Sequence, residues 1–403
     1  VENRRIYLAM LSGDYSATMP LDPLFAEAVP EVKSKVYNTP HIAVMVEQFL
    51  KFKASTMWAN KTHLDYVRVL KWFEETVGEN REFGSLKGSD IAAYRDLLMA
   101  IPKNLSKSKS FEDMKLKEVI ATSQEAEKLS MKTIRKYFMM MKTFVNWCCD
   151  ELDIPNAPGA KIKIAFPSNP QDARLPFSSD QLTRLFSSPL YSGCKSVNRR
   201  AIPGAKVIRD GKFWIPLVAL FSGMRMGEII QLGTEDFRND GGIWYLDINS
   251  TTSNGVAKKL KTTQSKRRIP IHEQLVQIGF VEYCKHRIEN PGKDPRLFPE
   301  VKPGKDGYAS HNFSKWFGRY VEQVDVKKPK TSFHSFRHNF KDRLHEAGVS
   351  DSHQHVLMGH SDKSVSASYG SGLSIGVLFK DMSEVSYPEL DLSHLHSLTQ
   401  VDG

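Results

Sequence analysis

The sequence predicts a mainly helical protein of two domains, with a small antiparallel β-sheet in the second domain. In the first half, four stretches carry apolar residues at helical spacing. A segment with four prolines and no helical period follows at residues 153–175, as expected for a linker between domains. Near residues 243–271, apolar and polar residues alternate in short runs separated by turn residues, a pattern typical of β-strands.

Four amphipathic stretches predict the helices of the first domain. In each, apolar residues recur every three or four positions, and Ser, Asp or Asn stands near the start, where it can cap a helix. The stretches are residues 39–54, 60–77, 89–100 and 130–152. The lysine-rich segment at residues 102–128 is longer than a usual connection between helices. It is either a partly ordered insertion whose lysines contact phosphate or a solvated loop.

Three runs predict the sheet of the second domain. They are IWYLDIN, VAKKLK and KRRIPI, with turn residues at 253–255 after the first run and Lys261 at the start of the turn before the last. Upstream, the apolar run LVALFSGMRMGEIIQL contains Arg225 and Glu228, three residues apart. A lone arginine is costly to bury without a partner. Glu228 is therefore expected to orient Arg225 or a neighbouring histidine.

Four polar residues gather near the C-terminus. His334 and Arg337 are three residues apart, so they share a face of a helix, and the phenylalanines around them give that helix an apolar side to bury. His360 stands at a predicted helix start, where backbone N–H groups favour an anion, and Tyr369 follows. A tyrosine hydroxyl, with an ordinary pKa of about 10, becomes a nucleophile when a base takes its proton and cations stabilise the group it attacks. This set is suited to phosphoryl chemistry.

Each of these residues also has an ordinary structural explanation. His334 can be a core histidine, and Arg225 can be the buried ion-pair partner of Glu228. Tyr369 taken alone can be a packing or surface residue. Only the joint pattern, in one order along the chain, favours chemistry over structure.

The joint pattern resembles the tyrosine recombinases, also called the phage integrase family. The likeness spans most of residues 173–385, and Met224, Asn339 and Met358, which depart from the residues common in the family, remove no reacting group. Its pieces, in family order, are Arg225 with Glu228, Lys261 in LKTTQSKRRIPI, His334 to Arg337, Gly359–His360, and Tyr369 nine residues after His360.

The resemblance implies a mainly α fold with a small antiparallel β-sheet. In this fold a helical core-binding domain and an α+β catalytic domain form a C-shaped clamp around DNA. Because the chain begins with Val1, we expect that an arm-site DNA-binding domain has been removed from its N-terminus. The expected divisions are an N-terminal extension at residues 1–38, the core-binding domain at 39–155, a linker at 156–172, the catalytic domain at 173–385 and a tail at 386–403.

The resemblance also implies the reaction. Tyr369 would attack the scissile DNA phosphate and form a 3'-phosphotyrosine, while Lys261 would protonate the leaving 5'-oxygen. The new ester keeps the energy of the broken bond, so another 5'-hydroxyl can reverse the attack and rejoin the DNA. The reaction implies neither a metal ion nor a nucleotide cofactor.

Five further residues would support the tyrosine. Arg225 and Arg337 would bind the non-bridging phosphate oxygens, where negative charge develops in the transition state. His334 would act as acid or base near the tyrosine, and His360 would hydrogen-bond the phosphate. Glu228 would support the arginine and the histidine rather than react.

The implied function is site-specific DNA recombination that integrates or excises a mobile element. A homotetramer would bind two double-stranded DNA attachment sites, exchange strands through a Holliday junction and use accessory DNA-bending factors as further partners. The protomers would exchange C-terminal helices, for which the candidates are Ile375, Val377, Leu378 and Phe379. A Xer-like dimer resolvase is the close alternative, while a type IB topoisomerase-like enzyme and a catalytically silent DNA-binding protein remain open.

Basic residues predict where the chain contacts DNA phosphates, which position a protein without reading sequence. Residues 191–211 form a basic insertion for which a solvated loop is the alternative interpretation. The candidates are Lys132, Arg135, Lys136 and Lys142 on the fourth predicted helix, and Arg199 and Arg200 in the insertion.

Composition agrees with a polyanionic partner, since the net charge is +10 and the isoelectric point is about 9.2. The four cysteines lack a C-x-x-C spacing, so we expect reduced core thiols rather than a disulfide framework or a zinc site. No apolar window approaches the length of a membrane span, and the first residues lack a signal-peptide core. We therefore expect a cytoplasmic protein of the bacterial nucleoid with no membrane partner.

Overall fold

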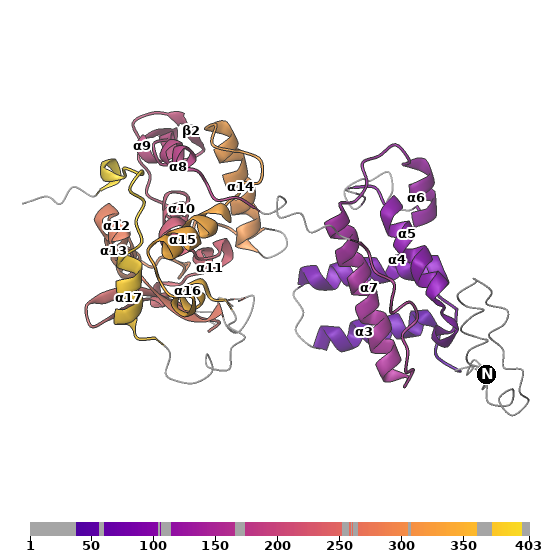
Figure 1. Ribbon diagram of the computed structural model, residues 1–403. Coiled ribbons are helices and arrows are strands. Elements are labelled where there is room, and N and C mark those ends of the chain that lie inside the picture. Colours follow the sequence, from indigo (N-terminus) through magenta and orange to yellow (C-terminus); the bar gives the residue numbers. More distant parts are fainter. Residues whose placement is uncertain are drawn as a thin grey trace, which may run out of the picture. The chain divides into compact units, whose positions relative to one another are not determined.

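The computed structural model divides the chain into two compact units, residues 1–168 and 169–403 (Figure 1). Each unit has its own buried core. The residues that the structure describes are 38–55, 60–103, 105, 114–165, 174–251, 258, 260, 265–304, 308–360 and 373–396.

Five helices form the described part of the first unit. The long helix α7 packs against α3, α4 and α5, and its buried residues recur every three or four positions from Ile134 to Cys149. Aromatic rings fill the space between these helices, with Phe49 and Phe73 both meeting Phe144 edge to face. The helices are α3 (Ile42–Ser55), α4 (Asn60–Val77), α5 (Gly88–Ala100), α6 (Leu116–Thr122) and α7 (Met131–Glu151).

The four helices predicted for this unit are confirmed, within three residues at each end. Helix α6 lies inside the segment predicted as a long insertion. It is held in place by the burial of Leu116 and Val119 and by the Leu116 backbone N–H, which donates to Glu75 Oε2 at 3.0 Å. A seven-residue helix is too short for its period to be read from sequence.

The second unit is built around helix α10, which is buried on nearly all sides (Figure 1), as expected for a helix that is apolar all round. Helix α15 packs against α10 and α16, and α17 packs against β5 and β4. The helices are α8 (Ser179–Phe186), α9 (Pro189–Ser192), α10 (Gly211–Ser222), α11 (Met226–Ile230), α12 (Glu273–Ile278), α13 (Phe280–Glu289), α14 (Ala309–Gln323), α15 (Ser335–Glu346), α16 (Asp351–Met358) and α17 (Ile375–Ser383).

A three-stranded antiparallel sheet with the order β3-β4-β5 lies in the second unit. Its strands are β3 (Phe237–Asp240), β4 (Ile243–Ile248) and β5 (Arg267–Pro270), and Leu246 of β4 faces Ile269 of β5. Two predicted runs supply β4 and β5, but β3 was missed because FRND has a single apolar residue. Of the predicted run VAKKLK, the structure describes only residues 258 and 260.

The basic insertion at residues 191–211 is a hairpin, β1 (Cys194–Ser196) and β2 (Arg199–Pro203). Arg199 is exposed, but Arg200 is buried and its guanidinium donates to Asp210 and to the carbonyls of Val197 and Ile208. The prediction that Arg200 contacts DNA is therefore wrong for this structure, since its charge is already paired inside the hairpin.

Helix α17, which carries the four residues expected at a subunit contact, packs on the chain's own second unit. Ile375 and Leu378 are buried against the chain's own second unit, where α17 lies on β5 and α16. Val377 and Phe379 remain about 40% exposed. Two of the four predicted docking residues thus belong to the core of the same chain.

Two further features bear on the predictions from composition. All four cysteines are free and buried, which confirms the prediction of core thiols. Among the described residues, no helix combines the length and the apolar character needed to cross a bilayer.

Asn339 ties the start of the second unit to helix α15. Its Oδ1 accepts the backbone N–H of Phe177 at 2.9 Å, and its Nδ2 donates to the Phe177 carbonyl at 2.7 Å. Both residues are buried.

Asn339→Ala should therefore leave two buried backbone groups unpaired and lower the free energy of unfolding by about 2–4 kcal/mol, as measured by urea denaturation. The exposed amide of Asn312 donates to two carbonyls, so Asn312→Ala, as the control, should change it by no more than about 0.5 kcal/mol. Equal effects of the two substitutions would contradict this explanation.

Candidate active site

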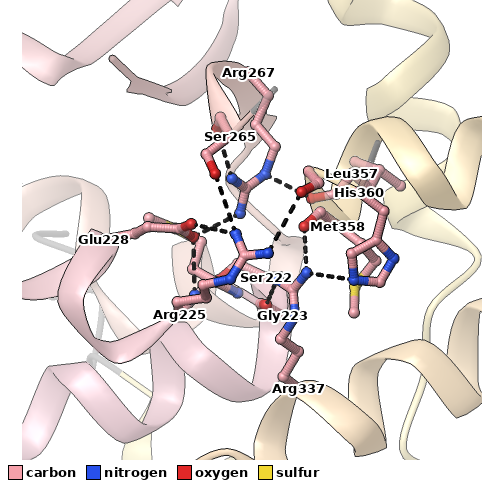
Figure 2. Close-up of polar contacts among 12 residues, drawn as sticks. Ser222, Gly223, Arg225, Glu228, Ser265, Arg267, Arg337, Leu357, Met358 and His360 are labelled. Atoms are coloured by element: carbon pink, nitrogen blue, oxygen red, sulfur yellow. Dashed lines mark hydrogen bonds and ion pairs between the residues drawn. The ribbon is translucent and has the colours of Figure 1, made fainter. Parts of the chain in front are cut away.

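Four elements far apart in sequence meet at one place in the second unit (Figure 2). Arg225 is the N-cap of α11, Arg267 begins β5, Arg337 lies in the first turn of α15, and His360 follows the end of α16. The three arginines donate to carbonyls of the C-terminal turn of α16, residues 357–359, and Arg337 also contacts His360. The tertiary fold thus gathers three arginines and a histidine around one turn.

Arg225 and Glu228 make a local pair across the start of α11. The Glu228 carboxylate accepts the Arg225 backbone N–H at 2.9 Å and its Nη1 at 2.7 Å. Glu228 is buried, whereas the Arg225 side chain is 25% exposed. Burial alone would raise the pKa of Glu228, but the charge of Arg267 and the hydrogen bonds from both arginines outweigh it, so this pKa is lowered. Glu228 is a carboxylate that holds Arg225 in place.

Arg337 is buried among acceptors from two segments, the residue after α10 and the end of α16. Its Nη1 donates to the Gly223 carbonyl at 2.6 Å, and its Nη2 donates to the Met358 carbonyl and to His360 Nε2, the latter at 2.9 Å. Burial, followed by the charges of Arg225 and Arg267, lowers the pKa of Arg337 to about 9. At neutral pH it therefore carries its charge.

The contact between Arg337 and His360 defines the protonation of the imidazole. A guanidinium can only donate, so His360 Nε2 must be the acceptor and His360 must be neutral. Loss of solvent around the ring, followed by the charges of Arg337 and Arg225, lowers the pKa of His360 to about 4. The pKa agrees with the hydrogen bond, because an imidazolium would have no lone pair to offer.

His334 stands at the N-cap position of α15 and is half-buried. Burial and the charges of His338 and Arg337 lower its pKa to about 4, so it is neutral at pH 7 and able to accept a proton. The neighbouring His338 lies edge to face with His334 at 5.1 Å between ring centroids.

The two depressed histidine pKa values predict a pH dependence of stability. Above about pH 6.5 these imidazoles are neutral in both the folded and the unfolded chain, so their contribution is complete. As the pH falls from about 6.5 to about 4, the unfolded chain takes up protons that the folded protein excludes, so the free energy of unfolding falls; below about pH 4 the loss levels off. Urea denaturation measured between about pH 4 and about pH 6.5 should show this fall in the free energy of unfolding. His334→Gln should flatten part of the profile, and an unchanged profile would contradict the assignment.

Arg267 was not singled out as a site residue from sequence. It is buried, and it donates from Nη2 to Glu228 Oε2 at 2.9 Å, from Nε to the Leu357 carbonyl at 2.8 Å and from Nη1 to the Ser265 carbonyl at 2.8 Å. The alternation of residues along the strand could have identified it from sequence. Arg267 lies on the same face as Ile269 and Ile271, which are both buried. An arginine on the buried face of a strand requires a buried partner.

Two predicted site residues, Lys261 and Tyr369, lie outside the described residues. Lys258, near Lys261 in sequence, is buried and pairs with Asp236 at 2.6 Å and Glu235 at 3.0 Å. In sequence, Tyr369 falls between α16, which ends beside the arginines, and α17.

The basic residues proposed on α7 differ in what they contact. Lys132, Arg135 and Lys136 are exposed, and Lys136 pairs with Asp65 at 2.5 Å. Lys142 is half-buried, and its ammonium donates to the carbonyls of Ala160 and Ile162 at 2.7 and 3.2 Å. Lys142 therefore holds the segment after α7 in this structure.

Comparison with known proteins adds a family and a fold. Residues 178–371 match the phage integrase family. Over 260 residues the chain is 24% identical to a protein described as "Tyrosine recombinase XerC-like" from Caldanaerobacter subterraneus subsp. tengcongensis, a match that covers 59% of this chain and 61% of that relative. The chain thus spans about three fifths of the length of this curated relative.

Solved structures share the fold at low sequence identity. The Tn1549 transposon integrase in complex with a circular intermediate DNA matches with a TM-score of 0.53 and 16% identity, over 85% of this chain and 99% of that one. A lambda integrase dimer bound to a COC' core site has a TM-score of 0.50 and 14% identity, over 92% and 89% of the two chains. A lambda integrase tetramer bound to a Holliday junction has a TM-score of 0.50 and 14% identity, over 93% and 88%.

Proposed function

Residues 178–371 belong to the phage integrase family, the tyrosine recombinases, and from this premise we propose that the chain is a site-specific DNA recombinase that breaks and rejoins strands through a 3'-phosphotyrosine. The observation that carries the proposal is the convergence of Arg225, Arg337 and His360 on the 357–359 turn. Two charged guanidiniums beside a neutral imidazole suit a phosphodiester, whose transition state gains negative charge on its non-bridging oxygens.

In the proposed reaction, the Tyr369 hydroxyl attacks the scissile phosphorus and the bond to the 5'-oxygen breaks. His334, neutral because of its low pKa, takes the tyrosine proton, and Lys261 gives a proton to the leaving 5'-oxygen. Arg225 and Arg337 bind the non-bridging oxygens, and His360 contributes a further hydrogen bond. Attack of a 5'-hydroxyl on the phosphotyrosine reverses the step and seals the strand.

At the level of the whole reaction, we propose that a homotetramer on two attachment sites exchanges strands through a Holliday junction and moves a mobile element. The fold similarity to the transposon and lambda integrases supports this choice. A Xer-like dimer resolvase is the second candidate, and the XerC-like relative favours it. Recombination between two sites on one plasmid, compared with recombination between separate molecules, discriminates between them.

DNA contact through Lys132, Arg135 and Lys136 remains part of the proposal, because these side chains are exposed on one helix. Arg199 is a fourth candidate, on the exposed side of its hairpin. Such phosphate contacts would steepen the salt dependence of binding without changing the sequence preference.

A covalent trapping experiment tests the proposed function. The protein is incubated in EDTA with labelled duplexes that carry a nick beside candidate attachment sites, taken from the DNA next to its gene, and the products are run on denaturing gels. We expect a covalent protein–DNA band, and we expect the released 5' end to be a substrate for polynucleotide kinase because it is a free hydroxyl. A 5'-linked product or a strict metal requirement would contradict the mechanism. Tight binding without a covalent band on a verified site would favour the silent DNA-binding protein.

A further inference from the structure

Arg267 differs from Arg225 because its guanidinium is buried and fully occupied within the protein. Its side chain is 2% exposed, compared with 25% for Arg225. All three guanidinium nitrogens donate to acceptors of the same chain: Glu228, Leu357 and Ser265. Figure 2 shows its guanidinium next to that of Arg225, with the Glu228 carboxylate in contact with both. It is poorly placed to reach a ligand but well placed to act on its neighbours.

The first consequence concerns charge. The Glu228 carboxylate lies between two guanidiniums, with Oε1 accepting from Arg225 at 2.7 Å and Oε2 accepting from Arg267 at 2.9 Å. A single carboxylate can neutralise only one of them. Because Arg267 and Glu228 are both almost fully buried, their charges compensate each other where water cannot. The charge of the more exposed Arg225 is then left for an anionic ligand.

The second consequence concerns the turn that precedes His360. Three successive carbonyls of this turn each accept from a different arginine: Leu357 from Arg267 at 2.8 Å, Met358 from Arg337, and Gly359 from Arg225 at 3.5 Å. Gly359 has a φ of +59°, and a Cβ atom there would lie 2.8 Å from Nη1 of Arg267. The left-handed C-cap Gly359 is therefore packed directly on Arg267.

We propose that Arg267 is a positioning residue of the recombination site. It compensates the charge of Glu228, so that Arg225 stays available for the scissile phosphate, and it anchors the 357–359 turn that leads to His360. This inference rests on the proposed function and adds to it a residue that touches no substrate atom.

The test measures single-turnover cleavage of the nicked duplex by Arg267→Met, Arg267→Lys and the double variant Glu228→Gln/Arg267→Met, together with DNA affinity and melting temperature. Arg267→Met leaves Glu228 with Arg225 as its main partner, so cleavage should slow about 100-fold while DNA affinity changes less than about threefold. Arg267→Lys keeps the charge but cannot donate to Glu228, Leu357 and Ser265 at once, so it should slow cleavage about tenfold.

The double variant separates positioning from simple structural support. In Arg267→Met the Glu228 charge engages Arg225; Glu228→Gln removes that charge and frees Arg225, so the double variant should cleave about tenfold faster than Arg267→Met alone. Lost packing would not be recovered in this way. If Arg267→Met does not fold, Arg267→Lys and the double variant test the inference. Arg267→Lys keeps a positive charge beside Glu228, and the double variant has no carboxylate there, so neither buries a carboxylate without its partner. Both should cleave more slowly than the wild type while still binding DNA.

The matched control is Arg268→Met, since Arg268 is the next residue of β5 and its side chain is 38% exposed. It should cleave within about threefold of the wild type. Wild-type rates for folded Arg267 variants, or a double variant no faster than Arg267→Met, would overturn the inference while leaving the proposed function intact. A wild-type protein that forms no covalent complex would overturn the proposed function, and this inference with it.

Discussion

Tyr369→Phe is expected to abolish the covalent protein–DNA complex, with a loss of cleavage of at least about 10⁴-fold, because the phenyl ring has no oxygen to attack phosphorus. DNA affinity should change by less than about threefold, because phosphate contacts from other basic residues provide most of the binding. The measurement is the fraction of labelled duplex that runs with the protein on a denaturing gel, compared with a mobility-shift titration of the same substrate.

The control for this substitution is Tyr245→Phe, which removes a hydroxyl from the buried Tyr245 of β4 in the same unit. It should leave covalent complex formation within about threefold of the wild type. A covalent band that persists in Tyr369→Phe would show that another residue is the nucleophile. Loss of the band in both variants would show that the assay reports folding and not chemistry.

Arg225→Met is the second substitution with a large expected effect. It removes a partly exposed guanidinium and leaves Glu228 paired with Arg267, so the protein should stay folded. Removing one preorganised donor to a developing oxyanion typically costs about 10²–10³-fold in rate, and we expect that loss in single-turnover cleavage. Arg225→Lys should recover part of the rate, because it keeps the charge but not the planar fork.

A neutral substrate makes the test of Arg225 specific. When the scissile phosphate is replaced by a methylphosphonate, one charged non-bridging oxygen is lost, so the penalty for Arg225→Met should shrink by about tenfold. Arg319→Met, at an exposed position on α14, serves as the control and should cleave both substrates like the wild type. An equal penalty on both substrates would show that Arg225 supports the fold rather than the phosphate.

Local patterns predicted much of the architecture. The four helices of the first unit follow from apolar residues at helical spacing, and the strands β4 and β5 follow from alternation. The pairing of Arg225 with Glu228 was expected because residues three apart share a helical turn. Short elements escaped: α6 has seven residues and β3 has four, too few for a period to stand out.

The candidate site was predicted as a set of residues but not as a network. Sequence motifs pointed to Arg225, Arg337 and His360, yet nothing in them showed that Arg337 would donate to His360 or that both arginines would contact one turn. Arg200 shows the opposite error, because a basic residue in a basic insertion proved to be buried beside Asp210. The charge of a side chain follows from the residue type, whereas its exposure to solvent depends on the fold.

The order and spacing of the reacting residues are properties of the sequence alone. The helices around them could also be predicted from the sequence, because a helical period involves only neighbours within one or two turns. The role of Arg267 required the tertiary structure. Its partners Glu228 and Leu357 are 39 and 90 positions away, and such contacts form only when β5, α11 and α16 pack together. Burial then makes each unpaired charge costly, so packing settles which arginine balances Glu228 and which remains open to a phosphate.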